Sequence, residues 1–199
     1  MRRGRNISLL IRDIMDFQDA LSLIEEIGAM SIMTLPEQKH IWKIAQEVAT
    51  LGPAIEVGCH LGGTTILLAL AGIETYAVDN GQAGRIFEFY QNIEKANVPV
   101  ELIQEDAVEA AKRFETRSCG LVIIDADHTG EHPYNDICAW TSKVAPGGYL
   151  MIDDVAAQIP DVTMATFRFL CENHDYGYAD CFEHPTWVGQ IKLLSLHKK

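Results

Sequence analysis

The sequence predicts an α/β protein built on a doubly wound, mainly parallel sheet with an antiparallel strand in its C-terminal part. From residue 54 onward, short apolar runs alternate with helical stretches, which is the pattern of strands joined by crossover helices. The apolar runs are nearly continuous, as in parallel strands buried on both faces. Residues 178–196 contain two further runs joined by a short link at Pro185, and so short a link can only join antiparallel strands.

Residues 7–50 are predicted to be helical and to precede the sheet. The stretch 7–28 has apolar residues at helical spacing and closes on Gly28, a plausible C-cap. The stretch 35–52 begins with Pro36 in its first turn and ends at Gly52. These helices either cover an edge of the sheet and shape a substrate mouth, or serve only packing or the formation of a homodimer. The second helix has an apolar face of Ile41, Ile44, Ala45 and Val48.

Five apolar runs are predicted to form the parallel strands, and each ends on or just before an acidic residue. In doubly wound sheets, ligands bind at the carboxyl ends of the strands. The acids at those ends are therefore the first candidates for a functional site. The predicted strands are 54–58, 75–79, 100–104, 121–125 and 149–153, and the predicted helices are 63–72, 85–97, 107–115, 134–144 and 161–173.

The length and the hydropathy of the chain predict one cytoplasmic domain. With 199 residues the chain is long enough to bury a hydrophobic core. We divide this one domain into an N-terminal helical extension (1–50) and a catalytic α/β part (54–199). No apolar run approaches the roughly 18 residues of a membrane span. The basic residues at the start imitate a signal peptide, but Arg12, Asp13 and Asp16 interrupt the apolar patch that follows.

The charge of the chain restricts its partners. With 28 acidic and 16 basic residues, the net charge is −12, which repels phosphate backbones and disfavours nucleic acid. A neutral or cationic small molecule is a better match. The five cysteines are scattered and form no C-x-x-C pair, which is typical of reduced thiols in the cytoplasm.

A glycine-rich turn, "EVGCHLGGTT", follows the first predicted parallel strand. Gly58 and Gly62 allow the backbone to approach a ligand, and Thr64 is placed to cap the next helix. The G-x-x-x-G spacing is not the dinucleotide fingerprint. Glu56, Asp79 and Asp106 would line the rim beside this turn. Three acids suit a ligand with an ammonium group, a ribose diol and an adenine amine, and S-adenosylmethionine has all three and a sulfonium cation.

The chain resembles class I S-adenosylmethionine-dependent methyltransferases in the motifs "IEVGCHLGGTT", "YAVDN", "QEDA" and "LVIIDADH…APGGYLMIDD". The resemblance implies a seven-stranded sheet with an antiparallel final strand. It also implies that Gly58 and Gly62 surround the methionine moiety, that Asp79 binds the ribose and that Asp106 or Ala107 lies near the adenine. For Asp106, a simple helix N-cap is an equal alternative. The full set of cofactor candidates is Glu56, Gly58, His60, Gly62, Thr64, Asp79, Asp106, Ala107 and Asp125.

A second group of acids is predicted at the ends of the fourth and fifth strands. A right-handed crossover makes these strands neighbours, about 4.8 Å apart, so that Asp125, Asp153 and Asp154 would face one pocket. Three converging carboxylates repel one another unless they are protonated or bind a cation. Ligands that are all oxygen favour Mg²⁺, with Ca²⁺ or Mn²⁺ as alternatives, over zinc.

This second group is similar to the metal site of small-molecule O-methyltransferases of the catechol and caffeoyl-CoA kind. It is closer still to the macrocin O-methyltransferase and cephalosporin-hydroxylase type. The resemblance implies a metal on Asp125, Asp153 and Asp154, with Asp127 as a supporting or substrate contact. His128 stands where catechol-type enzymes carry a lysine, and it could take the proton of the acceptor hydroxyl. The alternative is that His128 is a loop residue without a function.

Other functions compete with O-methylation. "HTGEH" (128–132) matches an inverted zinc-protease motif, which requires a continuous helix that Gly130 and Pro133 disfavour. A metal-dependent hydrolase would need the acids and the metal but not Asp79 or the glycine turn. A non-catalytic relative would bind the cofactor and methylate nothing. Tyr134, Trp140 and Trp187 are candidates for the substrate wall, although the position of Trp140 in mid-helix favours the core.

Overall fold

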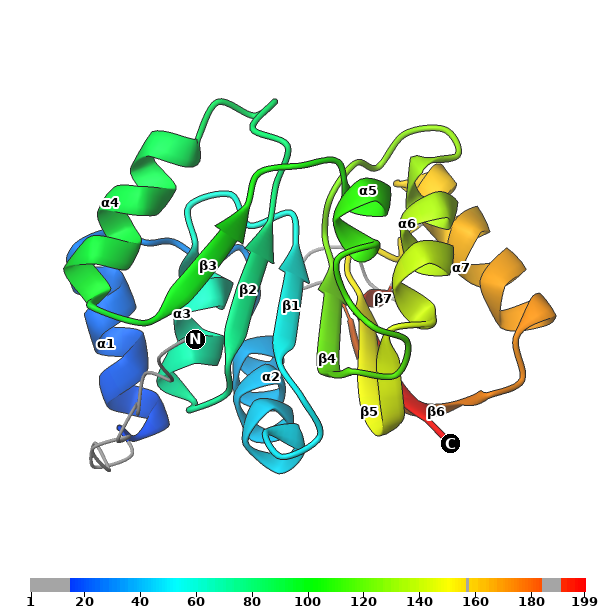
Figure 1. The fold of residues 1–199 in the computed structure, drawn as a ribbon, viewed down its shortest axis with the longest axis horizontal. Helices are drawn as coiled ribbons and strands as arrows, with labels where there is room; N and C mark the ends of the chain where they lie inside the picture. Colours follow the sequence, from blue (N-terminus) through cyan, green and yellow to red (C-terminus); the bar gives the residue numbers. More distant parts are fainter. Residues whose placement is uncertain (1–14, 157, 184–190) are drawn as a thin grey trace, which may run out of the picture.

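The computed structural model describes residues 15–156, 158–183 and 191–199, which form a seven-stranded sheet between two layers of helices (Figure 1). The strand order is β3-β2-β1-β4-β5-β7-β6. Strands β1 to β5 are parallel, and β7 runs antiparallel to both of its neighbours. The predicted fold class is confirmed. The strands are β1 (Ala54–Val57), β2 (Thr75–Val78), β3 (Val100–Ile103), β4 (Cys119–Ile124), β5 (Val144–Ile152), β6 (Tyr176–Glu183) and β7 (Ile191–Lys198).

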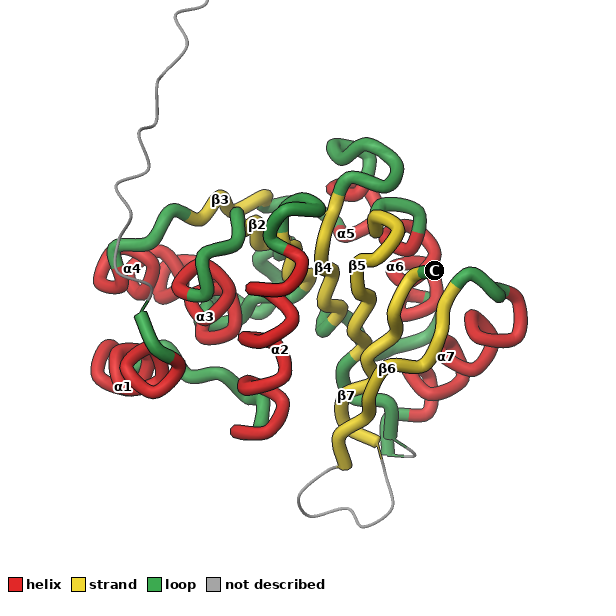
Figure 2. Tube along the Cα trace, turned by 90° about the horizontal axis from the view of Figure 1, so that it is seen from below, coloured by secondary structure: helices red, strands yellow, loops and turns green. Residues whose placement is uncertain are grey.

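The helices form two layers, with α1 to α4 on one face of the sheet and α5 to α7 on the other (Figure 2). The central strands supply both cores, because their side chains alternate between the faces. On β4, Leu121 and Ile123 join the core under α1 to α3, whereas Val122 and Ile124 join the core under α5 to α7. The helices are α1 (Phe17–Ile27), α2 (Leu35–Val48), α3 (Gly63–Leu70), α4 (Ile86–Ala96), α5 (Ala107–Ala111), α6 (His132–Thr141) and α7 (Pro160–Glu172).

The N-terminal helices end close to where the sequence predicts, but α1 starts at Phe17, so residues 15 and 16 of the predicted helical stretch 7–28 are not helical. Gly28 is the C-cap of α1 with a left-handed φ of 76°, and Asp16 caps its first turn. Thr34 and Glu37 form a capping box at the start of α2, and the predicted apolar face of α2 is buried. This helix ends at Val48, one turn before the predicted end at Gly52.

Two further differences concern helix length and range. Helix α5 ends at Ala111 rather than at residue 115, because the chain turns so that Phe114 packs against Tyr76 and Trp140. The predicted helical residues 7–14, the turn at Pro185 and the candidate Trp187 lie outside the described residues. Within the described ranges, no helix combines the length and the apolar character that a membrane span requires.

The C-terminal strands complete the edge of the sheet next to β5. Ile152 pairs with Leu194, and the backbone N–H of Val155 donates to the carbonyl of Lys192 at 3.2 Å. The alternation along β7 sends Leu194 and Leu196 into the core under α5 to α7. The pairing of β7 with β6 shifts its register between Leu193 and Ile191, so Lys192 lies at an irregularity of the strand, close to the carboxyl end of β5.

Candidate functional site

A cavity of about 560 Å³ opens at the carboxyl ends of β1 to β4. The strand order reverses between β1 and β4, so this is the switch point where doubly wound sheets bind ligands. Among the described residues, no Lys or Arg lines the cavity, and three histidines do. A ligand therefore meets a strongly negative wall. The carboxylates of the lining are Asp79, Glu105, Asp106, Asp125, Asp127 and Asp136.

The predicted glycine turn lines this cavity through Gly58 and His60. Gly58 has a φ of +90°, and a Cβ atom there would lie 1.9 Å from the backbone oxygen of Asp125, so only glycine fits. Gly62 has a φ of +85° and is the N-cap of α3. The predicted capping role of Thr64 is therefore wrong, because the left-handed Gly62 starts the helix two residues earlier. The Thr64 hydroxyl lies 2.9 Å from that of Ser31 instead.

Asp79 ties the glycine turn to the end of β2. It is half-buried in the cavity wall and accepts hydrogen bonds from the backbone N–H groups of Cys59 (3.3 Å) and Gly81 (2.8 Å). His60 also lines the cavity, and its φ of 45° is unusual for a residue other than glycine. The predicted cofactor residues Gly58, His60 and Asp79 thus lie together.

Glu56 takes a different position from Gly58, His60 and Asp79. Its side chain is 3% exposed and accepts a hydrogen bond from the Thr65 hydroxyl. It does not line the cavity, and neither do the predicted cofactor residues Gly62 and Thr64. Burial raises the pKa of Glu56 to about 8, so the folded protein holds this carboxyl largely protonated at neutral pH.

The buried Glu56 predicts that stability falls as the pH rises from about 4.5 to about 8. Across this window, unfolding releases a proton that the folded state keeps, so higher pH favours the unfolded state. Glu56→Gln should remove this contribution, at most about 1.4 kcal/mol per pH unit. Urea denaturation at pH 5, 6.5 and 8 measures it, with the exposed Glu109→Gln as control. If the free energy of unfolding changes with pH in the same way for wild type and Glu56→Gln, Glu56 is not the group that keeps its proton in the folded state.

Asp106 and Ala107 lie at the third strand end. Asp106 is exposed and is the N-cap of α5, because its Oδ1 accepts hydrogen bonds from Val108 N–H (2.9 Å) and Glu109 N–H (3.3 Å). The capping alternative is therefore confirmed. Both residues also line the cavity, so an adenine contact by either stays a prediction.

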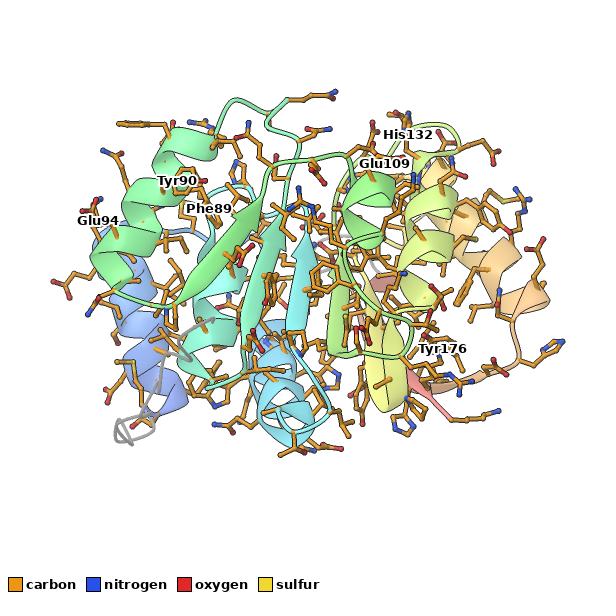
Figure 3. The ribbon with its side chains drawn as sticks, in the orientation of Figure 1. Phe89, Tyr90, Glu94, Glu109, His132 and Tyr176 are labelled. Carbon is orange, nitrogen blue, oxygen red and sulfur yellow. The ribbon has the colours of Figure 1, made fainter. Side chains whose placement is uncertain are left out.

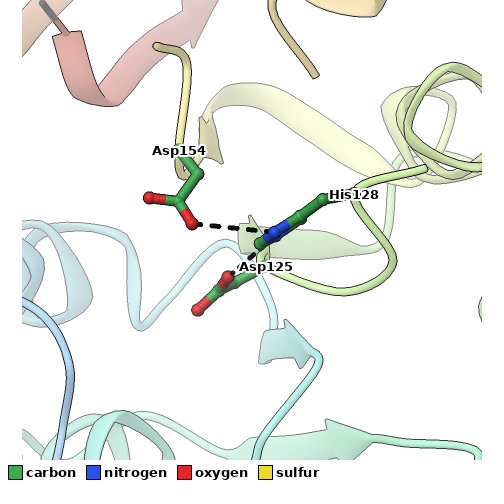
Figure 4. Close-up of side chains that lie close together, drawn as sticks. All are labelled: Asp125, His128 and Asp154. Atoms are coloured by element: carbon green, nitrogen blue, oxygen red, sulfur yellow. Dashed lines mark ion pairs between the residues drawn. The ribbon is translucent and has the colours of Figure 1, made fainter. Parts of the chain in front are cut away.

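Three side chains, those of Asp125, His128 and Asp154, lie close together, as Figure 4 shows. Asp125 and His128 line the cavity, and Asp154 does not. His128 Nε2 lies 3.4 Å from Asp125 Oδ1, and Nδ1 lies 3.7 Å from Asp154 Oδ2. One donor atom from each residue lies within 4.8 Å of the others. Asp154 has a left-handed φ of 55°, a strained conformation of the kind that collects at functional sites. The carboxylate of Asp125 outweighs partial burial and raises the pKa of His128 above 6.5.

Asp153 does not join this group as predicted. It is 1% exposed, and its Oδ2 accepts a hydrogen bond from Lys192 Nζ at 2.6 Å. Lys192 also reaches Asp154 Oδ1 at 3.3 Å. Burial lowers the pKa of Lys192, but the carboxylate of Asp153 outweighs this effect and keeps the amine charged. A buried ammonium group thus occupies the place beside Asp153 that the sequence assigns to a metal. Lys192 is the main site residue that the sequence analysis missed.

The other residues that the sequence singled out lie outside the cavity lining or do not form the motif that they resemble. Trp140 is fully buried in the core, as favoured. Tyr134 packs against Arg168, 3.7 Å from the guanidinium to the ring centre, and does not line the cavity. Helix α6 begins at His132, and Gly130 has a φ of 60°, so "HTGEH" is not a helical protease motif. The loop between α1 and α2 reaches the site through Ile32, which supports a substrate mouth formed by the N-terminal part.

Known proteins share this architecture. A methyltransferase domain family model matches residues 55–155, from β1 to just beyond β5. The chain belongs to the methyltransferase domain family. Its fold is that of class I S-adenosylmethionine-dependent methyltransferases, as the sequence motifs imply. The matched segment contains the glycine turn, Asp79, His128 and the acids after β4 and β5.

The solved structures similar to this methyltransferase include proteins named as an O-methyltransferase and as an rRNA methylase. An O-methyltransferase from Bacillus cereus, solved with S-adenosylhomocysteine, is 14% identical with a TM-score of 0.71, over 96% of this chain and 94% of that one. A Podospora anserina methyltransferase bound to the same product is 14% identical with a TM-score of 0.67, over 95% and 89%. An rRNA methylase from Streptococcus thermophilus is 16% identical with a TM-score of 0.62, over 85% and 99%. No curated protein sequence matches significantly. The fold alone therefore does not fix the acceptor.

Proposed function

We propose that this methyltransferase transfers the methyl group of S-adenosylmethionine to a hydroxyl oxygen of a small molecule. The observation that carries the proposal is the imidazole of His128 between two carboxylates, in the lining of a cavity that Gly58 of the glycine turn also lines. The glycine turn and Asp79 would hold the methionine and ribose parts of the cofactor. The acceptor would enter beside His128.

The proposed reaction uses the histidine as a proton acceptor. The acceptor oxygen forms its bond to the methyl carbon as the bond from carbon to sulfur breaks, and the sulfur keeps the electron pair. The hydroxyl proton passes to His128, which Asp125 and Asp154 orient and stabilise in its charged form. Holding both reactants in line supplies much of the rate.

The negative cavity supports an acceptor that is neutral or cationic. Its lining carries six carboxylates, so an anionic acceptor would meet strong repulsion, and nucleic acid is disfavoured for the same reason. Ile32 lines the mouth, and Met30 and Leu35 next to it are exposed. This apolar rim would contact a carbon skeleton, so we propose a hydroxylated small molecule with an apolar part.

We also propose a divalent cation, held by Asp125 and Asp154 rather than by all three predicted acids. Their carboxylate oxygens lie within 4.8 Å of each other, whereas Asp153 is paired with Lys192. Mg²⁺ commonly takes one or two protein carboxylates and completes its shell with water and substrate, and Mn²⁺ is the alternative. When bound there, the cation would lower the pKa of the acceptor hydroxyl.

Calorimetric titration of S-adenosylmethionine into ligand-free protein in EDTA tests the cofactor half of the proposal. We expect binding, and we expect Asp79→Ala to weaken it about tenfold or more, because the ribose would lose a charge-assisted hydrogen bond. Asp180→Ala, which removes a carboxylate away from the cavity lining, is the control. The absence of binding would overturn the proposal in favour of a metal-dependent hydrolase.

Methyl transfer to a panel of hydroxylated amines and phenols tests the acceptor and the cation. We expect turnover to stop in EDTA and to return with Mg²⁺ or Mn²⁺, while cofactor binding persists throughout. Turnover that continues in EDTA would overturn the proposed role of the cation and leave His128 as the sole proposed proton acceptor. Cofactor binding without any turnover would favour a non-catalytic relative.

A further inference from the structure

A buried carboxyl group with no hydrogen bond to any described residue lies in the wall of the same cavity. Asp136 is on α6, is 5% exposed and lines the cavity. Such a group is costly unless something bonds to it. Neither the sequence motifs nor the proposed transfer step uses this residue.

The position of Asp136 is beside the N-terminal end of α5, away from the acceptor group. Trp140, one helical turn later on α6, donates its indole N–H to the carbonyl of Ala107 at 3.1 Å. Residues four apart lie on one face of a helix, so Asp136 lies on this α5-facing side, one turn closer to the cavity. Figure 3 shows His132 at the start of α6 and Glu109 on the neighbouring α5.

The charges around Asp136 agree with this placement. Burial raises the pKa of Asp136 to about 7, and the charged groups that act on it are Asp106, His132 and Asp127. Asp125 and Asp154, which flank His128, are not among them. Asp136 therefore belongs to the end of the cavity formed by Asp106 and Ala107.

A hydrogen-bond donor of a ligand would find a free acceptor at this end of the cavity. Asp106 Oδ1 already accepts two backbone N–H groups of α5, whereas both oxygens of Asp136 are free of described partners. A cofactor with its methionine part at Gly58 and its ribose at Asp79 would extend its base toward Ala107. We propose that Asp136 accepts a hydrogen bond from the exocyclic amino group of the cofactor's adenine, and this inference rests on the proposed function.

The test compares two cofactor products that differ only at this amino group. S-adenosylhomocysteine carries the amine, and its 6-deamino analogue, in which purine replaces adenine, carries a hydrogen atom there. We expect wild type to bind the adenine compound about tenfold or more tightly by calorimetry, because only the amine can donate a hydrogen bond to Asp136. Asp136→Ala removes the acceptor, so the preference should fall to about twofold or less.

The controls separate this inference from the proposed function. Asp180→Asn changes a carboxylate that does not line the cavity and should keep the wild-type ratio. Asp136→Ala should weaken the binding of the adenine compound and leave that of the purine compound nearly unchanged, and circular dichroism checks that each variant folds. An unchanged ratio in Asp136→Ala, with tight binding of S-adenosylhomocysteine by wild type, overturns the inference alone. Binding of neither compound by wild type overturns the proposed function as well.

Discussion

Replacement of His128 by glutamine is expected to lower kcat by about 10²–10⁴-fold and to leave the affinity for S-adenosylmethionine nearly unchanged. Glutamine keeps a polar side chain of similar reach but cannot accept the hydroxyl proton. The imidazole is 3.4 Å from Asp125 and 3.7 Å from Asp154, so the two carboxylates stabilise the charged form that proton transfer creates. Initial rates with saturating cofactor, together with calorimetric binding, separate the loss of chemistry from the loss of binding.

The matched control for this change is His174→Gln, which alters an exposed histidine just before β6. We expect its kcat to remain within about twofold of wild type, because surface substitutions away from a site have small effects. A His128→Gln enzyme with a kcat within a few-fold of wild type would show that the proton leaves by another route. The cofactor half of the proposed function would survive that outcome, whereas the role of His128 would not.

The fold was predictable because the hydrophobic pattern of each strand agrees with the place that the crossover rule gives it in the sheet. The run Leu121–Ile124 is apolar at every position, and both faces of β4 do pack against helices. The crossover rule predicts that β4 and β5 are neighbours, and the N–H of Asp153 does donate to the carbonyl of Ile124 at 3.0 Å. The strand-end acids therefore meet at one edge of the sheet without any knowledge of side-chain direction.

Side-chain direction is the part that could not be predicted. On β1, Glu56 alternates with Ile55 and Val57, which pack on the side of α5 to α7, so it points to the opposite side and meets Thr65 of α3. The same sequence pattern would place Glu56 on the opposite face of the sheet if the strand were rotated by half a turn about its axis. Likewise, the pair Gly62–Gly63 does not reveal which glycine takes the left-handed conformation, and this decides that Thr64 is inside the helix and not its cap.

The contact of Lys192 with the two acids could not be predicted for a related reason. Lys192 lies on the final strand, 38 residues after Asp154, and a shift of one residue in the pairing of β7 with β5 would turn its side chain to the other face of the sheet. Only the observed register, in which Ile152 pairs with Leu194, brings the amine to the two acids. The chain itself therefore supplies one positive charge among the three predicted acids, and a divalent cation beside them stays a prediction.

Replacement of Lys192 by methionine is expected to lower the free energy of unfolding by about 3–5 kcal/mol, the usual cost of leaving one partner of a buried ion pair alone. The Lys192 side chain is 7% exposed and that of Asp153 is 0% exposed, so water cannot replace the lost contact of 2.6 Å. Urea denaturation followed by circular dichroism measures the change. Lys112→Met is the control, because the pair of Lys112 with Glu109 is exposed and should contribute less than about 1 kcal/mol.

The double variant Lys192→Met/Asp153→Asn decides whether the cost comes from the unpaired charge or from lost packing. If the charge of Asp153 is the cause, the amide removes it, and the double variant should recover most of the stability that the single variant loses. If packing is the cause, the double variant should be no more stable than Lys192→Met alone. Recovery would mean that Asp153 and Lys192 form a structural ion pair, which leaves Asp125 and Asp154 as the two acids that we propose for a cation.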